Sequence, residues 1–151
     1  MPPMDMNIGR DTLLALAALA WSDGKLDPRE AAGIRSAAQQ LSLPNNERSL
    51  LEEALTKTVS LDQVETVRMT RLTRLFTYAA ACWIAELDGG LSAAEQGALD
   101  LLGDRLGLSK LARDRALGVA RGNRTPGAND SYDLLKLRSR LSAGLSQIGD
   151  E

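Results

Sequence analysis

The chain repeats itself within its own length. Shifted by 65 positions, Leu13–Leu43 aligns with Tyr78–Leu108 without a gap. The identities cluster in one motif, D-G-x-L-x-x-x-E, which begins at Asp23 and again at Asp88. A repeat of this kind is one supersecondary unit that buries its apolar face against its neighbour. The sequence therefore predicts one domain built by internal duplication.

Each copy reads as helix, turn and helix. An apolar helix comes first, and Gly24 or Gly89 can adopt the left-handed conformation that ends it. The second helix starts with a capping pattern in which a glutamate follows the capping residue by three positions. We expect four equivalent pairs to share buried roles: Leu19 with Ile84, Leu26 with Leu91, Ile34 with Leu99, and Leu41 with Leu106.

Composition supports an all-α fold. Only 3% of the residues are aromatic, and the chain is rich in alanine and leucine, which cost least in a helix. We predict a single compact domain of about seven helices. The expected boundaries are an N-terminal extension at 1–12, the duplicated domain at 13–121, a loop at 122–129 and a C-terminal helix at 130–151 packed on the same domain.

The residue types that the chain lacks exclude several classes of catalytic site and metal site. Without histidine, the Ser-His-Asp and Cys-His catalytic arrangements and every imidazole zinc site are excluded. The single Cys82 suits a reducing compartment and can form neither an intramolecular disulfide nor a thiolate zinc cluster. Any metal must have oxygen ligands, which favours calcium, magnesium or manganese. A net charge of −2 makes nucleic acid a poor partner.

The apolar run Leu13–Trp21 imitates the core of a signal peptide. A similar run, Leu75–Ala85, lies in the middle of the chain, where no signal peptide can be. Both runs belong to the repeat, and neither approaches the roughly 20 apolar residues that span a bilayer. We therefore expect a cytoplasmic protein with at most a peripheral membrane association.

Four acidic residues form the candidate metal site: Asp23 and Glu30 in the first copy, Asp88 and Glu95 in the second. The motif matches the second half of an EF-hand loop, but the leading ligand positions would be occupied by apolar residues such as Leu19. A site shared between the copies would arise if the two turns lie side by side. The alternative is purely structural, with the glutamates in capping boxes and the aspartates in turns.

A second feature is basic. Arg68, Arg71 and Arg74 are spaced three residues apart and would follow one side of a long helix that runs from about Ser60 to Glu86, with or without a break. Such a stripe could meet phosphate or an acidic partner. The alternative is a solvated helix face.

The two Ala-rich helices, each followed by D-G-x-L-x-x-x-E, resemble the TerB family of tellurite-resistance proteins from Leu13 to about Leu117. The resemblance implies an internally duplicated helical domain of the bacterial cytoplasm, linked to tellurite resistance and other chemical stress. It also implies that acidic residues bind metal. At the matching positions of this chain, these residues are Asp23, Glu30, Asp88 and Glu95.

Together these observations predict a non-enzymatic stress-response module that binds a divalent cation, a protein partner, or both. The alternative is a degenerate EF-hand-like calcium sensor. An enzyme that uses the four carboxylates and a metal ranks below both, because no nucleophile, base or phosphate-binding loop accompanies them.

Overall fold

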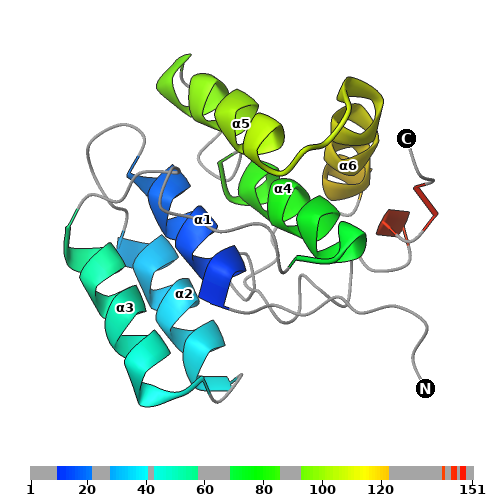
Figure 1. Ribbon diagram of the computed structural model, residues 1–151. Helices are drawn as coiled ribbons and strands as arrows, with labels where there is room; N and C mark the ends of the chain where they lie inside the picture. The colour runs from blue at the N-terminus through cyan, green and yellow to red at the C-terminus, as the bar shows by residue number, and fades with distance from the viewer. Residues whose placement is uncertain are drawn as a thin grey trace, which may run out of the picture.

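The computed structural model describes residues 10–21, 28–40, 43–57, 69–85, 93–122, 141, 144–145 and 147–148. This part of the chain contains six α-helices and no strand (Figure 1). The all-α prediction is therefore confirmed. The helices are α1 (Arg10–Ala20), α2 (Pro28–Gln40), α3 (Asn45–Thr56), α4 (Arg71–Ala85), α5 (Ala93–Arg105) and α6 (Lys110–Gly122).

The helix boundaries repeat at the same offset as the sequence. Both ends of α5 lie 65 residues after the ends of α2. The last residues of α1 and α4 differ by 65, and so do the first residues of α3 and α6. The duplication therefore includes a third helix in each copy, and we define α1–α3 as the first repeat and α4–α6 as the second repeat.

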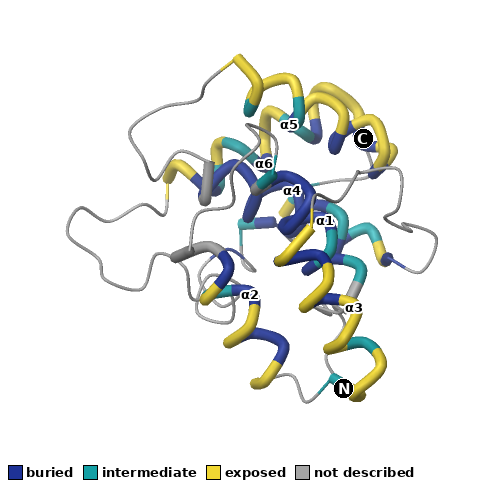
Figure 2. Tube along the Cα trace, turned by 90° about the vertical axis from the view of Figure 1, so that its left-hand side faces the viewer, coloured by how far each residue is buried: buried dark blue, intermediate teal, exposed yellow. Residues whose placement is uncertain are grey.

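The first helices of the two repeats form the centre of the molecule. α1 packs against α2 and α3 of its own repeat and against α4 and α5 of the other, while α4 also packs against α5 and α6. Figure 2 shows α1 and α4 buried along much of their length, whereas α2, α3 and α5 alternate between buried and exposed residues. No described helix is long and apolar enough to cross a membrane.

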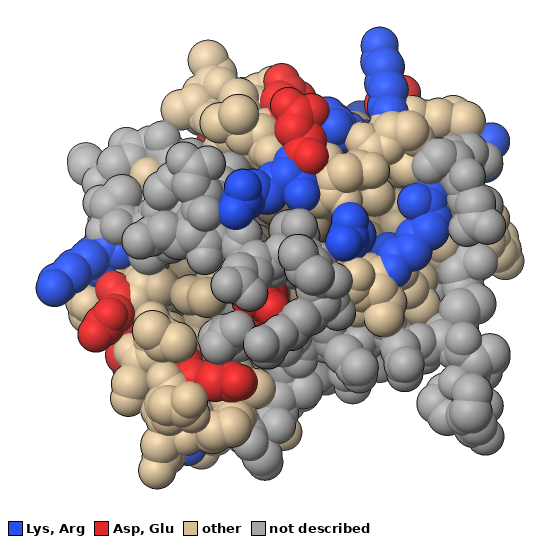
Figure 3. All heavy atoms as spheres, in the orientation of Figure 1, with Lys and Arg blue, Asp and Glu red and all other residues tan. Residues whose placement is uncertain are grey.

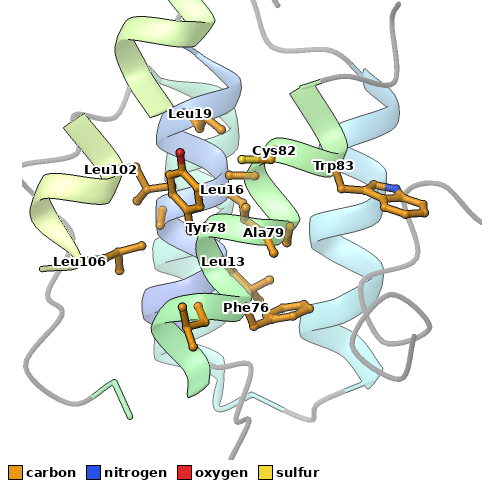
Figure 4. Close-up of a cluster of buried hydrophobic side chains, with 14 of the residues drawn as sticks. Leu13, Leu16, Leu19, Phe76, Tyr78, Ala79, Cys82, Trp83, Leu102 and Leu106 are labelled. Carbon is orange, nitrogen blue, oxygen red and sulfur yellow. The ribbon is translucent and has the colours of Figure 1, made fainter. Parts of the chain in front are cut away.

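Small residues let the central helices approach their neighbours closely. In α1 and α4 the alanines Ala15, Ala17, Ala79, Ala80 and Ala81 have no exposed surface. Larger side chains fill the spaces around them, and Figure 4 shows leucines of α1 and α5 beside Phe76 and Tyr78 of α4. This interdigitation of small and large residues forms one continuous hydrophobic core in the described part of the chain.

The two repeats meet at a pair of equivalent threonines. The Oγ1 atoms of Thr12 and Thr77 lie 3.1 Å apart, and both side chains are buried. The Thr77 hydroxyl donates to the carbonyl of Thr73 at 2.8 Å, so the Thr12 hydroxyl must be the donor between the two threonines. A contact between residues 65 positions apart identifies the local twofold relation between the repeats.

The expected core positions can be compared where both residues are described. Ile34 and Leu99 are both buried, which confirms that pair. Leu19 and Leu106 are buried as well, but the side chains of their partners, like Leu26 and Leu91, lie outside the described residues. Leu102 and Gly103 lie on the same side of α5 as Leu99, and all three residues are buried, as is Leu106 directly after the helix.

Three helix starts have residues that favour them. Pro28 is the first residue of α2, and α3 begins directly after Pro44. The Ser109 hydroxyl accepts a hydrogen bond from the Ala112 amide at 3.1 Å, as expected for the residue that caps α6.

The expected seventh helix, from about residue 130, lies mostly outside the described residues. Its described part belongs to the same core, since Leu141 and Leu145 have no exposed surface. A Cβ added at Gly144 would come 2.9 Å from Val119 of α6, so the backbone packs closely there.

The basic stripe does not follow one continuous helix. Met69 and Thr70 are not helical, and α4 begins at Arg71, where the Thr70 hydroxyl accepts a hydrogen bond from the Thr73 amide at 3.1 Å. Thr70 thus caps α4 and separates it from Arg68, which lies outside the described residues. The three arginines therefore do not share one uninterrupted helix, because a local side-chain cap starts α4 only at Arg71, and the place of Arg68 stays a prediction.

The phenol side chain of Tyr78 lies in the hydrophobic core. Tyr78 is 6% exposed, and it shares a hydrogen bond with the thiol of Cys82, one helical turn away. Burial, followed by the nearby Cys82 thiol, raises the pKa of Tyr78 far above its ordinary value. Cys82 itself is 1% exposed and serves as a small core residue, as its position in an apolar run predicts.

The threonine pair predicts an asymmetric mutational effect. Thr77→Val removes the acceptor of the Thr12 hydroxyl and should cost roughly 1 to 2 kcal/mol, whereas Thr12→Val removes only a donor and should cost less. The double variant should cost less than the sum, with a coupling of roughly 0.5 to 1 kcal/mol in urea denaturation. Thr56→Val is the control, because Thr56 bonds only within α3. Strict additivity of Thr12→Val and Thr77→Val would contradict the contact.

The raised pKa of Tyr78 predicts an alkaline loss of stability. The folded protein holds the phenol proton more tightly than the unfolded chain does, so stability is fully present below about pH 10 and falls as the pH rises beyond it. Tyr78→Phe keeps the ring and removes the proton. Denaturation of both proteins at pH 7 and pH 11 should therefore show a smaller alkaline loss for Tyr78→Phe. Equal losses would mean that Tyr78 ionises freely in the folded state.

Candidate functional site

The structure places two of the four candidate acids at equivalent helix starts. Glu30 lies in the first turn of α2, and Glu95 lies in the first turn of α5. Glu95 is partly exposed. Asp23 and Asp88, together with the side chain of Glu30, lie outside the described residues. Within the described part, no three acidic or cysteine side chains are grouped to hold a metal ion.

The central helices end on the same side of the molecule. Figure 4 shows Leu13, Leu16 and Leu19 rising along α1 in the direction in which Phe76 and Cys82 rise along α4, and Figure 1 agrees. The two D-G-x-L segments follow these helix ends in the chain. The twofold relation between the repeats thus extends to the starting points of both acidic segments.

The positions at which an EF-hand would begin its ligand series serve the core instead. Leu19 packs in the hydrophobic core, and the Trp21 indole donates a hydrogen bond to the Ala54 carbonyl of α3 at 2.7 Å. Neither side chain offers oxygen to a cation. Trp21 joins the end of α1 to α3 and so holds the helix end from which the first acidic segment departs.

The other end of α5 is built as a C-terminal cap. Gly107 has a φ of 70°, its amide donates to the Asp104 carbonyl at 3.0 Å, and the Leu108 amide donates to the Gly103 carbonyl at 3.1 Å. This is the Schellman pattern, in which glycine avoids the Cβ clash of the left-handed conformation. The first repeat has the equivalent bond from the Leu43 amide to the Ala38 carbonyl at 3.3 Å.

Two arginines from neighbouring helices bind this cap. The Arg74 Nη1 of α4 donates to the Leu106 carbonyl at 3.0 Å, and the Arg113 Nε of α6 donates to the Leu108 carbonyl at 2.9 Å. Arg113 also forms an ion pair with Asp104, with 2.7 Å between Nη2 and Oδ1. Positive charge at a helix C-terminus is favourable because it meets the negative end of the helix dipole.

This arrangement gives the second repeat an arginine clamp, defined here as Arg74 and Arg113 on the end of α5. A Cβ at Gly103 would lie 2.5 Å from the Arg113 Nε, so glycine is what lets the guanidinium cross α5. The equivalent residue in the first repeat is Ala38. That alanine-to-glycine difference is the one sequence signal of the clamp. Arg74, considered above for partner binding, thus has a structural role.

Figure 3 shows that most of the basic side chains on this face lie over the half formed by α4, α5 and α6. This half of the molecule contains the arginine clamp, and its first helix, α4, begins at Arg71. In the first repeat, the described ion pair joins the exposed side chains of Arg35 and Glu52, on α2 and α3, at 2.7 Å. Such an exposed pair contributes little to stability.

Comparison with known proteins identifies a family. The model of DUF533, described as a protein of unknown function, matches residues 5–116, which is more than half of the chain. Comparison with curated proteins and with solved structures gives no significant match. The matched range includes α1 to α5 and the first half of α6, and so contains both acidic segments. The chain belongs to the DUF533 family.

Proposed function

We propose that this protein is a non-enzymatic, TerB-like stress-response module that binds a divalent cation through Asp23, Glu30, Asp88 and Glu95. The observation that carries the proposal is the common offset of the helix boundaries. α2 and α5 start 65 residues apart and follow central helices that end on the same side, which supports equivalent places for the two acidic segments.

The number of acids also favours this function. A capping box needs one carboxylate three residues after the capping residue, and Glu30 and Glu95 fill that role. Each repeat keeps a second carboxylate, Asp23 or Asp88, that capping does not need. Carboxylate oxygens are the ligands that calcium, magnesium and manganese prefer.

The TerB-like part of the proposal adds a biological setting. The motif spacing that resembles TerB lies inside the range matched by DUF533. We infer a role in resistance to tellurite or related chemical stress in the bacterial cytoplasm, in which the cation-binding module acts with a protein partner.

Isothermal titration with calcium, magnesium and manganese tests the cation site directly. The expected result is binding by the full chain and a rise in melting temperature that grows with cation concentration, since the cation binds only the folded protein. Asp23→Asn with Asp88→Asn should abolish both effects and leave the folded protein intact, because Glu30 and Glu95 remain to cap their helices.

Glu53→Gln with Asp114→Asn is the matched control. It also removes two negative charges, from exposed positions on α3 and α6, and should bind cations as the original chain does. An unchanged response in the Asp23 and Asp88 double variant would contradict the shared site. Binding of one calcium per repeat, with loss of only half of the sites when Asp23 alone is changed, would favour the EF-hand-like alternative.

A further inference from the structure

The second repeat exposes two leucines that the fold does not require. Leu101 of α5 is 62% exposed and Leu111 of α6 is 46% exposed. The first repeat provides an internal comparison, because the residues 65 positions earlier are Ser36 and Asn46, both exposed. The same helical positions therefore accept polar residues, and the fold does not depend on leucine there.

Small residues precede Leu101 on one exposed side of α5, and the exposed Asp104 and Arg105 follow it. Ala94, Gly97 and Leu101 are spaced by three and four residues, so they share one side of the helix, and all three are exposed. A Cβ added at Gly97 would meet nothing within 4 Å. The face thus consists of one protruding leucine beside a flat, open stretch. The first repeat has Arg29 at the position of Ala94.

The exposed face of α6 has the same elements. Leu111, Arg115, Gly118 and Gly122 follow one another at intervals of four, three and four residues, which places them along one side of the helix. All four are exposed, and a Cβ at either glycine would meet nothing within 4 Å. The open stretch at the two glycines lies beyond Arg115 and could receive the leucine of the α5 face.

The two helices carry opposite charge. α5 has three acids, Glu95, Asp100 and Asp104, against one arginine, whereas α6 has one lysine and three arginines against Asp114. Asp104 and Arg113 pair with each other within the chain, and the remaining charges still differ in sign, with two acids against one arginine on α5 and three basic residues against one acid on α6. Within one chain both helices pack on α4 with these faces outward, so they do not cover each other. A second copy of the chain presents the complementary face to each of them.

We propose that the chain forms a twofold dimer in which α5 of one copy docks on α6 of the other. The twofold axis makes the contact occur twice, since α6 of the first copy receives α5 of the second. Leu101 and Leu111 supply the apolar surface that is buried, and the opposite charges of the two helices fix the pairing. This inference does not depend on the cation site.

The test is sedimentation equilibrium of the full chain over a wide range of protein concentrations. Leu101→Ser with Leu111→Asn introduces the residues that the first repeat carries at the equivalent positions, so the monomer should keep its fold. The expected result is a dimer for the original chain and a dissociation constant raised about a hundredfold or more in the variant, because each of two contacts loses two leucines. Added salt should also weaken the original dimer.

Leu50→Arg is the matched control. Leu50 is a third exposed leucine, 43% exposed on α3, and the equivalent residue of the second repeat is Arg115. This variant should dimerise as the original chain does, and circular dichroism should show the same helix content for all proteins. A chain that is monomeric at every concentration, or a dimer weakened as much by Leu50→Arg as by the double variant, would overturn the proposal.

Discussion

The packing of α1 against α4 is the contact on which the rest of the structure depends. Each helix is the centre of its own repeat, and neither repeat alone covers all sides of such an apolar helix. Alanines bring the central helices close to their neighbours, and the buried contact between Thr12 and Thr77 joins equivalent points of the two repeats. Both central helices end on the same side of the molecule, and α5 and α6 pack on the outside of α4.

The repeat in the sequence was sufficient to predict the fold class and most helices, because apolar periodicity and capping residues act within a few positions. It was insufficient where a distant contact or a local cap intervenes. Arg74 follows the spacing of a surface stripe, yet its guanidinium binds the Leu106 carbonyl, which no local pattern indicates. Thr70 caps the start of α4 at a point where the apolar pattern alone does not predict a helix end. The candidate metal site stays a prediction from the sequence, because Asp23 and Asp88 lie outside the described residues.

Comparison between the repeats separates what the fold needs from what function has added. Positions that are buried in both, such as Ile34 and Leu99, reflect the common core. The acids retained in both D-G-x-L segments fit a role that uses the two repeats together. Differences are equally informative, because the arginine clamp and the exposed leucines occur in the second repeat at positions where the first carries Ala38, Ser36 and Asn46. The two repeats thus share one architecture and differ in the residues that they carry on the surface.

The most direct test of the central claim is an intramolecular disulfide between the two repeats. The background substitution is Cys82→Ala, which introduces the residue that the first repeat has at the equivalent position, Ala17. In this chain, Thr12→Cys and Thr77→Cys place two thiols where the hydroxyl oxygens are 3.1 Å apart. Peptide mass spectrometry after mild oxidation should find the two cysteines joined within one monomer, since side-chain atoms this close bring the two sulfur atoms within reach of each other. Two free thiols in a folded, oxidised monomer would contradict the twofold pairing of the repeats.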